Sequence, residues 1–183
     1  MQIFFFRLFF ILTIIFLEFS FFDILFPTTP APLVLLTGVV VWVLLSGFTQ
    51  ALFMIIPLVI LFDIIATGMP GTLTLYALLL AYTTSFLSRR LLVEHQGVGM
   101  FLYALFSALG AFGYMVFHFL LLRPSDFFGF PEIFFGLWSV FSFSNILFVS
   151  AWSVPLFFFA YIGIRRFEHY AGTMSRNDFL NVK

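Results

Sequence analysis

Three ionisable side chains stand inside otherwise apolar stretches of this sequence, and they are the first candidates for chemistry: Glu18, Asp63 and His118. An acidic side chain at the centre of a bilayer costs about 2.5 to 3.5 kcal/mol, so each group needs a partner or a route to water. We expect all three near the outer ends of predicted helices, with Asp63 and His118 as a candidate pair and Asp63 more important than Glu18 for assembly. Alternatively, both acids reach the outer headgroups, and His118 stays neutral with a backbone partner.

Polar side chains also gather in the last apolar stretch, at Ser139, Ser142, Ser144, Asn145, Ser150 and Ser153. Hydrogen bonds between membrane helices are worth about 0.6 kcal/mol on average, so stability alone is a modest reason for them. The pattern predicts a helix that faces inward beside a polar cavity, with Asn145 as a further intramembrane candidate.

The sequence lacks the signatures of several common reaction types. It contains no Gly-Xaa-Ser-Xaa-Gly elbow, no phosphate-binding Gly-Lys-Ser/Thr loop and no His-Glu-Xaa-Xaa-His metal motif. It contains no cysteine, which excludes disulfides and thiolate-bound metals. Eight basic residues balance eight acidic ones, so no basic stripe is available for nucleic acid. We expect a protein that is not an enzyme and has no cofactor, metal or nucleic-acid partner.

Composition favours a membrane protein. Hydrophobic residues make up 63% of the 183 residues and aromatic residues 22%, while 9% are charged, against about 25% in a soluble domain. So few charged residues cannot cover a water-soluble surface of this size. The surface is therefore expected to face membrane lipids, and the fold class to be all-α.

Cutting the sequence at its charges and its Pro, Gly and Thr clusters predicts a polytopic bundle of six transmembrane helices. The predicted spans are residues 3–22, 33–48, 51–67, 72–88, 98–122 and 139–164. No small-residue cleavage site follows the first span, which we expect to be a retained anchor. We expect residues 127–138 to lie along the interface, residues 1–170 to form one membrane domain, and residues 171–183 to form a short polar cytoplasmic tail.

The distribution of basic residues favours two short crossings over residues 33–67. One long helix or a hairpin that never crosses are the alternatives. A single crossing would put Arg89 and Arg90 on the side opposite Arg7 and break the positive-inside pattern. With two crossings, Arg123 lies alone on the outer side and both termini are cytoplasmic. The basic residues on the inner side are then Arg7, Arg89, Arg90, Arg165, Arg166, Arg176 and Lys183.

Small residues recur at four-residue spacing in two of the predicted spans. They are Ala77, Ala81 and Ser85 in the fourth span, and Ala104 with Ala108 and Ser107 with Ala111 in the fifth. Such steps let helix backbones approach closely, so they predict helix packing. Tyr114 and His118 continue the stripe of Ser107 and Ala111 toward the bundle interior, where a ligand-lining role is the alternative.

One stretch of the sequence, about residues 30–88, resembles a known family. Its matching positions are Pro32 before the second span, Asp63 closing the third, the turn Gly68, Pro70 and Gly71, and Tyr76 in the fourth. This pattern resembles the rod shape-determining protein MreD family, small bacterial membrane proteins with about six spans.

The resemblance implies a non-catalytic subunit of the bacterial cell-elongation machinery, which builds side-wall peptidoglycan in the cytoplasmic (inner) membrane. The implied partners are an MreC-like protein and the pair of RodA and a penicillin-binding transpeptidase. MreD-like bundles also resemble the substrate-binding subunits of energy-coupling-factor transporters, so vitamin uptake is the alternative. Those subunits carry an Ala-Xaa-Xaa-Xaa-Ala step in their first span, whereas residues 3–22 contain neither Ala nor Gly. We therefore rank transport second.

Overall fold

Helices form all the regular structure in the described part of the chain. The computed structural model describes residues 2–22, 33–65, 71–91, 96–122 and 143–170. The elements are α1 (Gln2–Leu17), the π-helix η1 (Glu18–Phe22), α3 (Leu33–Ser46), α4 (Phe48–Ile65), α5 (Thr72–Leu91), α6 (Gln96–Leu122) and α8 (Phe143–Tyr170). No strand occurs in these residues, which confirms the predicted all-α class.

Each predicted span corresponds to one helical segment, because η1 continues α1 directly. The expected interfacial segment 127–138 and the expected tail 171–183 lie outside the described residues. The described part of the last span is α8, Phe143–Tyr170, and the predicted residues 139–142 lie outside the described residues.

The break between α3 and α4 lies at Gly47, not at Thr49 and Gln50 as the sequence analysis expected. Gly47 has a φ of 76°, a left-handed conformation that only glycine adopts without strain. Its amide donates to Val43 O and its carbonyl accepts from Ala51, so one residue ends the first helix and starts the next. Thr49 and Gln50 are exposed residues in the first turn of α4. Residues 33–65 are therefore two helices and not one long helix.

The core of the molecule is α3. Every side chain from Leu35 to Val43 is buried, and Trp42 is completely inaccessible. This helix packs against α1, α4, α5, α6 and α8. Its 14 residues rise about 21 Å, less than the roughly 30 Å of a bilayer core. Because five other helices surround it, α3 forms the centre of the core.

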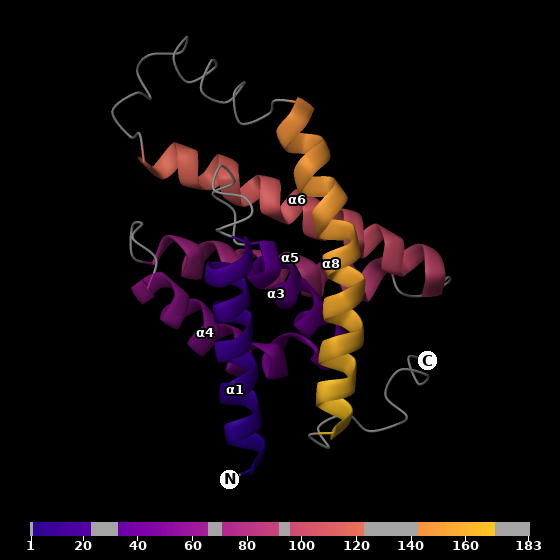
Figure 1. The fold of residues 1–183 in the computed structure, drawn as a ribbon. Helices are drawn as coiled ribbons and strands as arrows, with labels where there is room; N and C mark the ends of the chain where they lie inside the picture. The colour runs from indigo at the N-terminus through magenta and orange to yellow at the C-terminus, as the bar shows by residue number, and fades with distance from the viewer. Residues whose placement is uncertain (1, 23–32, 66–70, 92–95, 123–142, 171–183) are drawn as a thin grey trace.

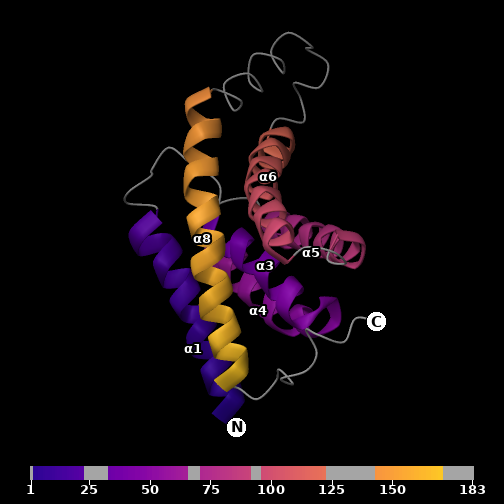
Figure 2. The ribbon, with the colours of Figure 1, turned by 90° about the vertical axis from the view of Figure 1, so that its right-hand side faces the viewer.

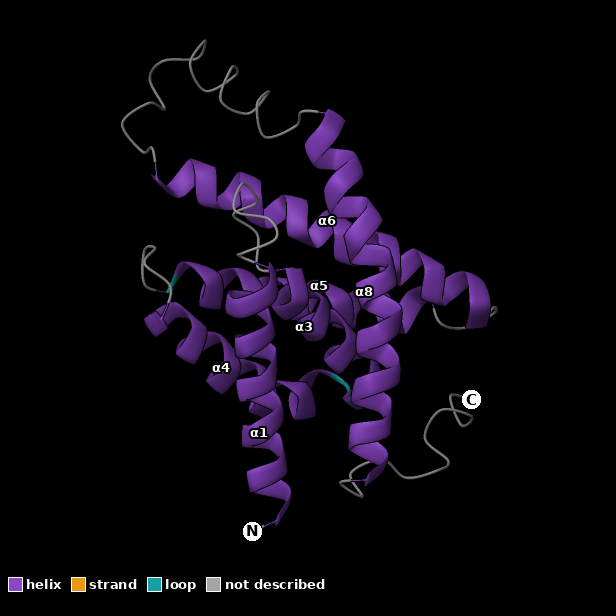
Figure 3. Cartoon of the chain, viewed as in Figure 1, coloured by secondary structure: helices purple, strands orange, loops and turns teal. Residues whose placement is uncertain are grey.

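The remaining helices are arranged in layers around α3. Figure 1 shows α1 and α8 in front of the other helices and running in opposite chain directions, and in Figure 2 both lie to the left of α5 and α6. Helix α6 crosses behind α8 at a steep angle and packs against it. Helix α1 begins and α8 ends at the bottom of Figure 1, whereas α6 ends at the upper left. The two described breaks between helices, at Gly47 and Gly71, are teal in Figure 3, with Gly47 below the centre and Gly71 at the left edge.

Large apolar side chains cover the outside of the described helices. The most exposed are Phe9, Phe16, Phe53, Ile64, Leu109 and Phe159. Two helical stretches, Phe48–Ile65 and Gly99–His118, are long and apolar enough to cross a membrane. Shorter apolar helices run over Ile11–Ser20, Val34–Ser46 and Thr72–Ser88. An apolar surface on this scale is unusual for a soluble monomer.

Candidate functional site

Glu18 binds the start of the central helix. Its Oε2 accepts hydrogen bonds from the backbone amides of Val34, at 2.8 Å, and Leu35, at 3.1 Å. These amides belong to the first turn of α3, where backbone donors have no partner within the helix. The positive end of the helix dipole also favours a carboxylate there. A buried acid, 6% exposed, is thus satisfied by another helix and not by headgroups.

Asp63 binds the start of α5 in the same way as Glu18 binds the start of α3. Its Oδ2 accepts from the backbone amide of Thr74 at 3.0 Å and from the Thr74 hydroxyl. Gly71 precedes this helix with a φ of 88°, and its carbonyl accepts the amide of Leu75 at 2.9 Å. The turn that the sequence analysis assigned to Gly71 is therefore a helix start held by an acid from the preceding helix.

A stacked aromatic pair joins the two capped ends. Phe19, next to Glu18, stacks on Phe62, next to Asp63, with ring centroids 4.8 Å apart. The end of α4 therefore lies beside η1. We call Glu18, Asp63, Phe19 and Phe62 the capping cluster.

Tyr76 joins α5 to α6 by a hydrogen bond, two residues after Thr74, the partner of Asp63. Its hydroxyl donates to the carbonyl of Gly110 at 2.6 Å in a buried position. A Cβ at Gly113 would overlap that hydroxyl, so the absence of a side chain there makes room for the ring. The ring also meets Tyr114 edge to face, with centroids 5.5 Å apart. Tyr76, assigned to the family motif, is therefore a helix-packing residue in this structure.

His118 lies beside Tyr114 but is not bonded to Asp63. The imidazole stacks on the Tyr114 ring, with centroids 5.6 Å apart. His118 Nδ1 is buried and has no hydrogen-bond partner within the described part of the chain. The hydrogen bonds of Asp63 go to Thr74. The helix N-terminus satisfies the carboxylate at close range, so the expected pair of Asp63 and His118 is not formed in this structure.

The small residues lie mainly on buried helix faces. Ala77 and Ala81 of α5 are completely buried, and Ser85 is half-buried. On α6, the buried small residues are Ala104, Ser107, Ala108 and Ala111. The Ser107 hydroxyl donates to Thr37 Oγ1 on α3 at 3.0 Å. This face of α6 therefore packs on the central helix and contributes an interhelical hydrogen bond.

On α8, Ser153 is completely buried, and Ser150 is half-buried. The Ser153 hydroxyl and the buried Tyr103 hydroxyl have no hydrogen-bond partner among the described residues. The Asn145 side chain and the motif residues Pro32, Gly68 and Pro70 lie outside the described parts of the structure.

Sequence reasoning missed the partners of the polar side chains. Thr74 and the two glycines Gly110 and Gly113 were not singled out, although the glycines are three residues apart on one helix. Within the described ranges, no group of three or more His, Asp or Glu side chains could hold a metal ion. The polar groups at this end of the bundle join helices by hydrogen bonds and do not converge on a common point.

Comparisons of the chain with protein-family models, curated proteins and solved structures found no match.

Proposed function

We propose that this chain is a six-span membrane protein with both termini in the bacterial cytoplasm, and that it acts as a non-catalytic scaffold subunit of the cell-elongation machinery. One observation carries the proposal. Three positions of the resemblance to the MreD family lie at contacts between helices: Asp63 of α4 caps α5, Gly71 precedes α5, and Tyr76 joins α5 to α6. These residues fix the helices relative to one another. A rigid bundle of this kind suits a subunit that binds partners through its helix faces.

The surface supports a membrane environment. Exposed apolar side chains follow α5 at helical spacing, at Leu75, Leu79, Tyr82 and Phe86. Hydroxyls near the outside are bonded to carbonyls of their own helices, as Thr13 is to Phe9 O and Thr83 to Leu79 O. A hydroxyl satisfied in this way can face lipid without an unpaired donor.

The arrangement of the helix ends supports six crossings. The start of α1 and the end of α8 lie at the lower end of the molecule in both ribbon views (Figures 1 and 2). The break at Gly47 also lies toward that end, and the one at Gly71 lies higher, at the left edge (Figure 3). Helices that alternate in this way would leave Arg165 and Arg166 on the same side as the start of α1, as the positive-inside rule requires.

Thiol labelling tests this topology, because the chain has no natural cysteine and a single introduced one gives an unambiguous signal. We expect Arg123→Cys to react with an impermeant maleimide in intact cells. Arg89→Cys and Arg166→Cys should react only after the membrane is permeabilised, since both positions are cytoplasmic in the proposed layout. Labelling of Arg89→Cys in intact cells would overturn the six-crossing arrangement.

The proposed partners are membrane proteins, an MreC-like protein and the RodA and penicillin-binding transpeptidase pair. We expect depletion of the protein in a rod-shaped host to produce round cells, because side-wall synthesis would lose its scaffold. Cell width and length measured by microscopy check this result. Co-purification in mild detergent should recover MreC-like or RodA-like chains. Unchanged rods after full depletion would contradict the proposal.

A second candidate is a substrate-binding subunit of a vitamin transporter. It is favoured by the buried hydroxyls of Tyr103 and Ser153, which lack protein partners in the described residues and could bond a small polar molecule. A vitamin retained by the purified protein, or co-purification of an ATPase module, would favour transport over the scaffold.

A further inference from the structure

Near the end of α8, two adjacent arginines have no acidic partner among the side chains that the structure describes. Arg165 and Arg166 are both exposed, and neither has a hydrogen bond or ion pair within the described part of the chain. The Arg165 guanidinium lies over the ring of Tyr161, 6.0 Å from its centroid. Tyr161 in turn stacks on the fully buried Phe157. The Tyr161 ring therefore packs against the Arg165 guanidinium, and the N–H donors of Arg165 stay available for a ligand.

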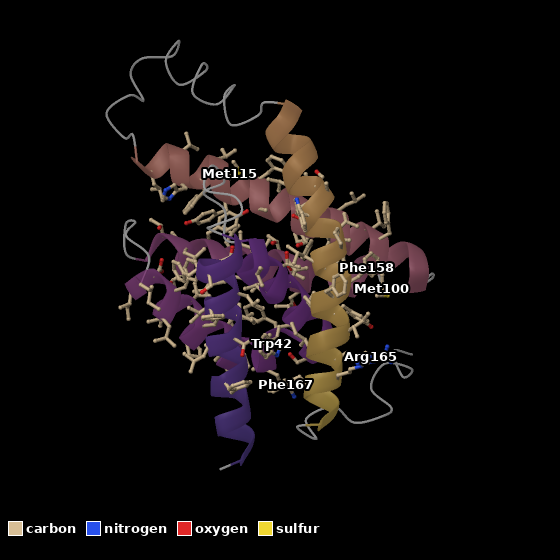
Figure 4. The ribbon with its side chains drawn as sticks, in the orientation of Figure 1. Trp42, Met100, Met115, Phe158, Arg165 and Phe167 are labelled. Atoms are coloured by element: carbon tan, nitrogen blue, oxygen red, sulfur yellow. The ribbon has the colours of Figure 1, made fainter. Side chains whose placement is uncertain are left out.

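The same face of α8 carries exposed apolar side chains one and two turns before the arginines. Phe158, Phe159 and Ile162 are 37%, 76% and 51% exposed. With 3.6 residues per turn, these three and the two arginines fall within an arc of about 120°. Figure 4 shows Arg165 near the lower end of α8 and Phe158 higher on the same helix. The strip is apolar along its length and doubly positive at its end.

A strip of this kind matches the chemistry of an anionic phospholipid. A guanidinium binds phosphate oxygens with two parallel hydrogen bonds, which an ammonium group cannot do. Basic residues at the cytoplasmic end of a membrane helix attract anionic headgroups. Aromatic and aliphatic side chains directly above them provide a surface for an acyl chain. Zwitterionic lipid offers the same chain without the net charge.

We propose that Arg165 and Arg166 bind the phosphate of an anionic phospholipid whose acyl chain lies along Phe158, Phe159 and Ile162. The proposal rests on the membrane location proposed above. It assigns α8 a second role, because the face opposite the arginine strip is buried at Val149, Ser153 and Ile164, and α8 packs on α3 and α6. A lipid held there would fix the height of α8 in the bilayer.

Titration of the purified full-length protein in detergent tests the proposal, with bound lipid counted by native mass spectrometry. We expect phosphatidylglycerol to bind more tightly than phosphatidylcholine, and each arginine to contribute about fivefold to that preference. The variant Arg165→Gln/Arg166→Gln should bind the two lipids equally. The variant Arg165→Lys/Arg166→Lys keeps the charge and should keep a preference for phosphatidylglycerol. Arg123→Gln removes a charge that lies on the outer side in the proposed layout, so this variant should bind like the wild type.

Equal affinity of the wild type for the two lipids would overturn the proposal, as would an unchanged preference in the glutamine variant. Inorganic phosphate supplies the charge without the acyl chain, so displacement of the lipid by millimolar phosphate would also overturn it. If the protein is recovered from membranes but shows no lipid preference, only this inference fails. Recovery in the soluble fraction would remove the membrane proposal as well.

Discussion

Replacing Glu18 with alanine is expected to lower the free energy of unfolding by about 3 kcal/mol. The carboxylate accepts two backbone amides at the start of α3, and hydrogen bonds to a charged group contribute about 1.5 to 3 kcal/mol each. Without it, the amides of Val34 and Leu35 lose this acceptor in a site with little access to water. The loss of these hydrogen bonds would affect α3, the helix on which five others pack.

Glu18→Gln is the informative comparison, because its amide oxygen can still accept a hydrogen bond. We expect it to cost about 1 kcal/mol, the difference between a charged and a neutral acceptor. Thr13→Val is a control on the same helix. Its hydroxyl bonds only to Phe9 O of its own helix at an exposed position, so the expected change is within about 0.5 kcal/mol.

Thermal and chemical unfolding in detergent would measure these changes. A second readout follows the start of α3 directly, because Val34→Cys would be the only thiol in the chain. That thiol should react faster in the Glu18→Ala background, as the first turn of α3 loses its cap. Unchanged stability together with unchanged thiol reactivity would show that Glu18 is not the capping group.

Gly113→Ala is expected to cost about 2 kcal/mol, because the new methyl group would displace the Tyr76 hydroxyl from its bond to Gly110 O. The same substitution should be nearly neutral in a Tyr76→Phe background. The nearest ring atom would then be Cζ, 3.4 Å from the new Cβ, which is ordinary van der Waals contact. Alanine is also the better helix former, by about 1 kcal/mol.

A double-mutant cycle measures this coupling from four unfolding curves. Tyr76→Phe alone should cost about 1 kcal/mol for the lost hydrogen bond. Gly163→Ala on α8 is the matched control, since a Cβ there meets nothing within 4 Å, and it should be neutral or stabilising. An equal cost of Gly113→Ala in both backgrounds would mean that the Tyr76 hydroxyl does not occupy the space beside Gly113.

The two acids differ in what they contribute to the stability of the fold. The sequence predicts a larger role for Asp63 than for Glu18 in assembly with partners, which is a separate property from stability. In the structure both acids cap helices, but Glu18 is buried and receives two backbone amides of the central helix. Asp63 is partly exposed and receives one backbone amide and one hydroxyl from Thr74. We therefore expect the larger loss of stability at Glu18.

Hydropathy alone determined the helical class and the approximate extent of each helix, because long apolar stretches between polar breaks can satisfy their backbone only as helices. It also identified Glu18, Asp63 and His118 as groups in need of partners. The partners themselves depended on how the helices pack. Glu18 reaches across 16 and 17 residues to the start of α3, and α3 becomes the core only because five helices surround it. Apolar length is a local property of the chain, whereas a hydrogen bond between two helices exists only once their ends have been brought together.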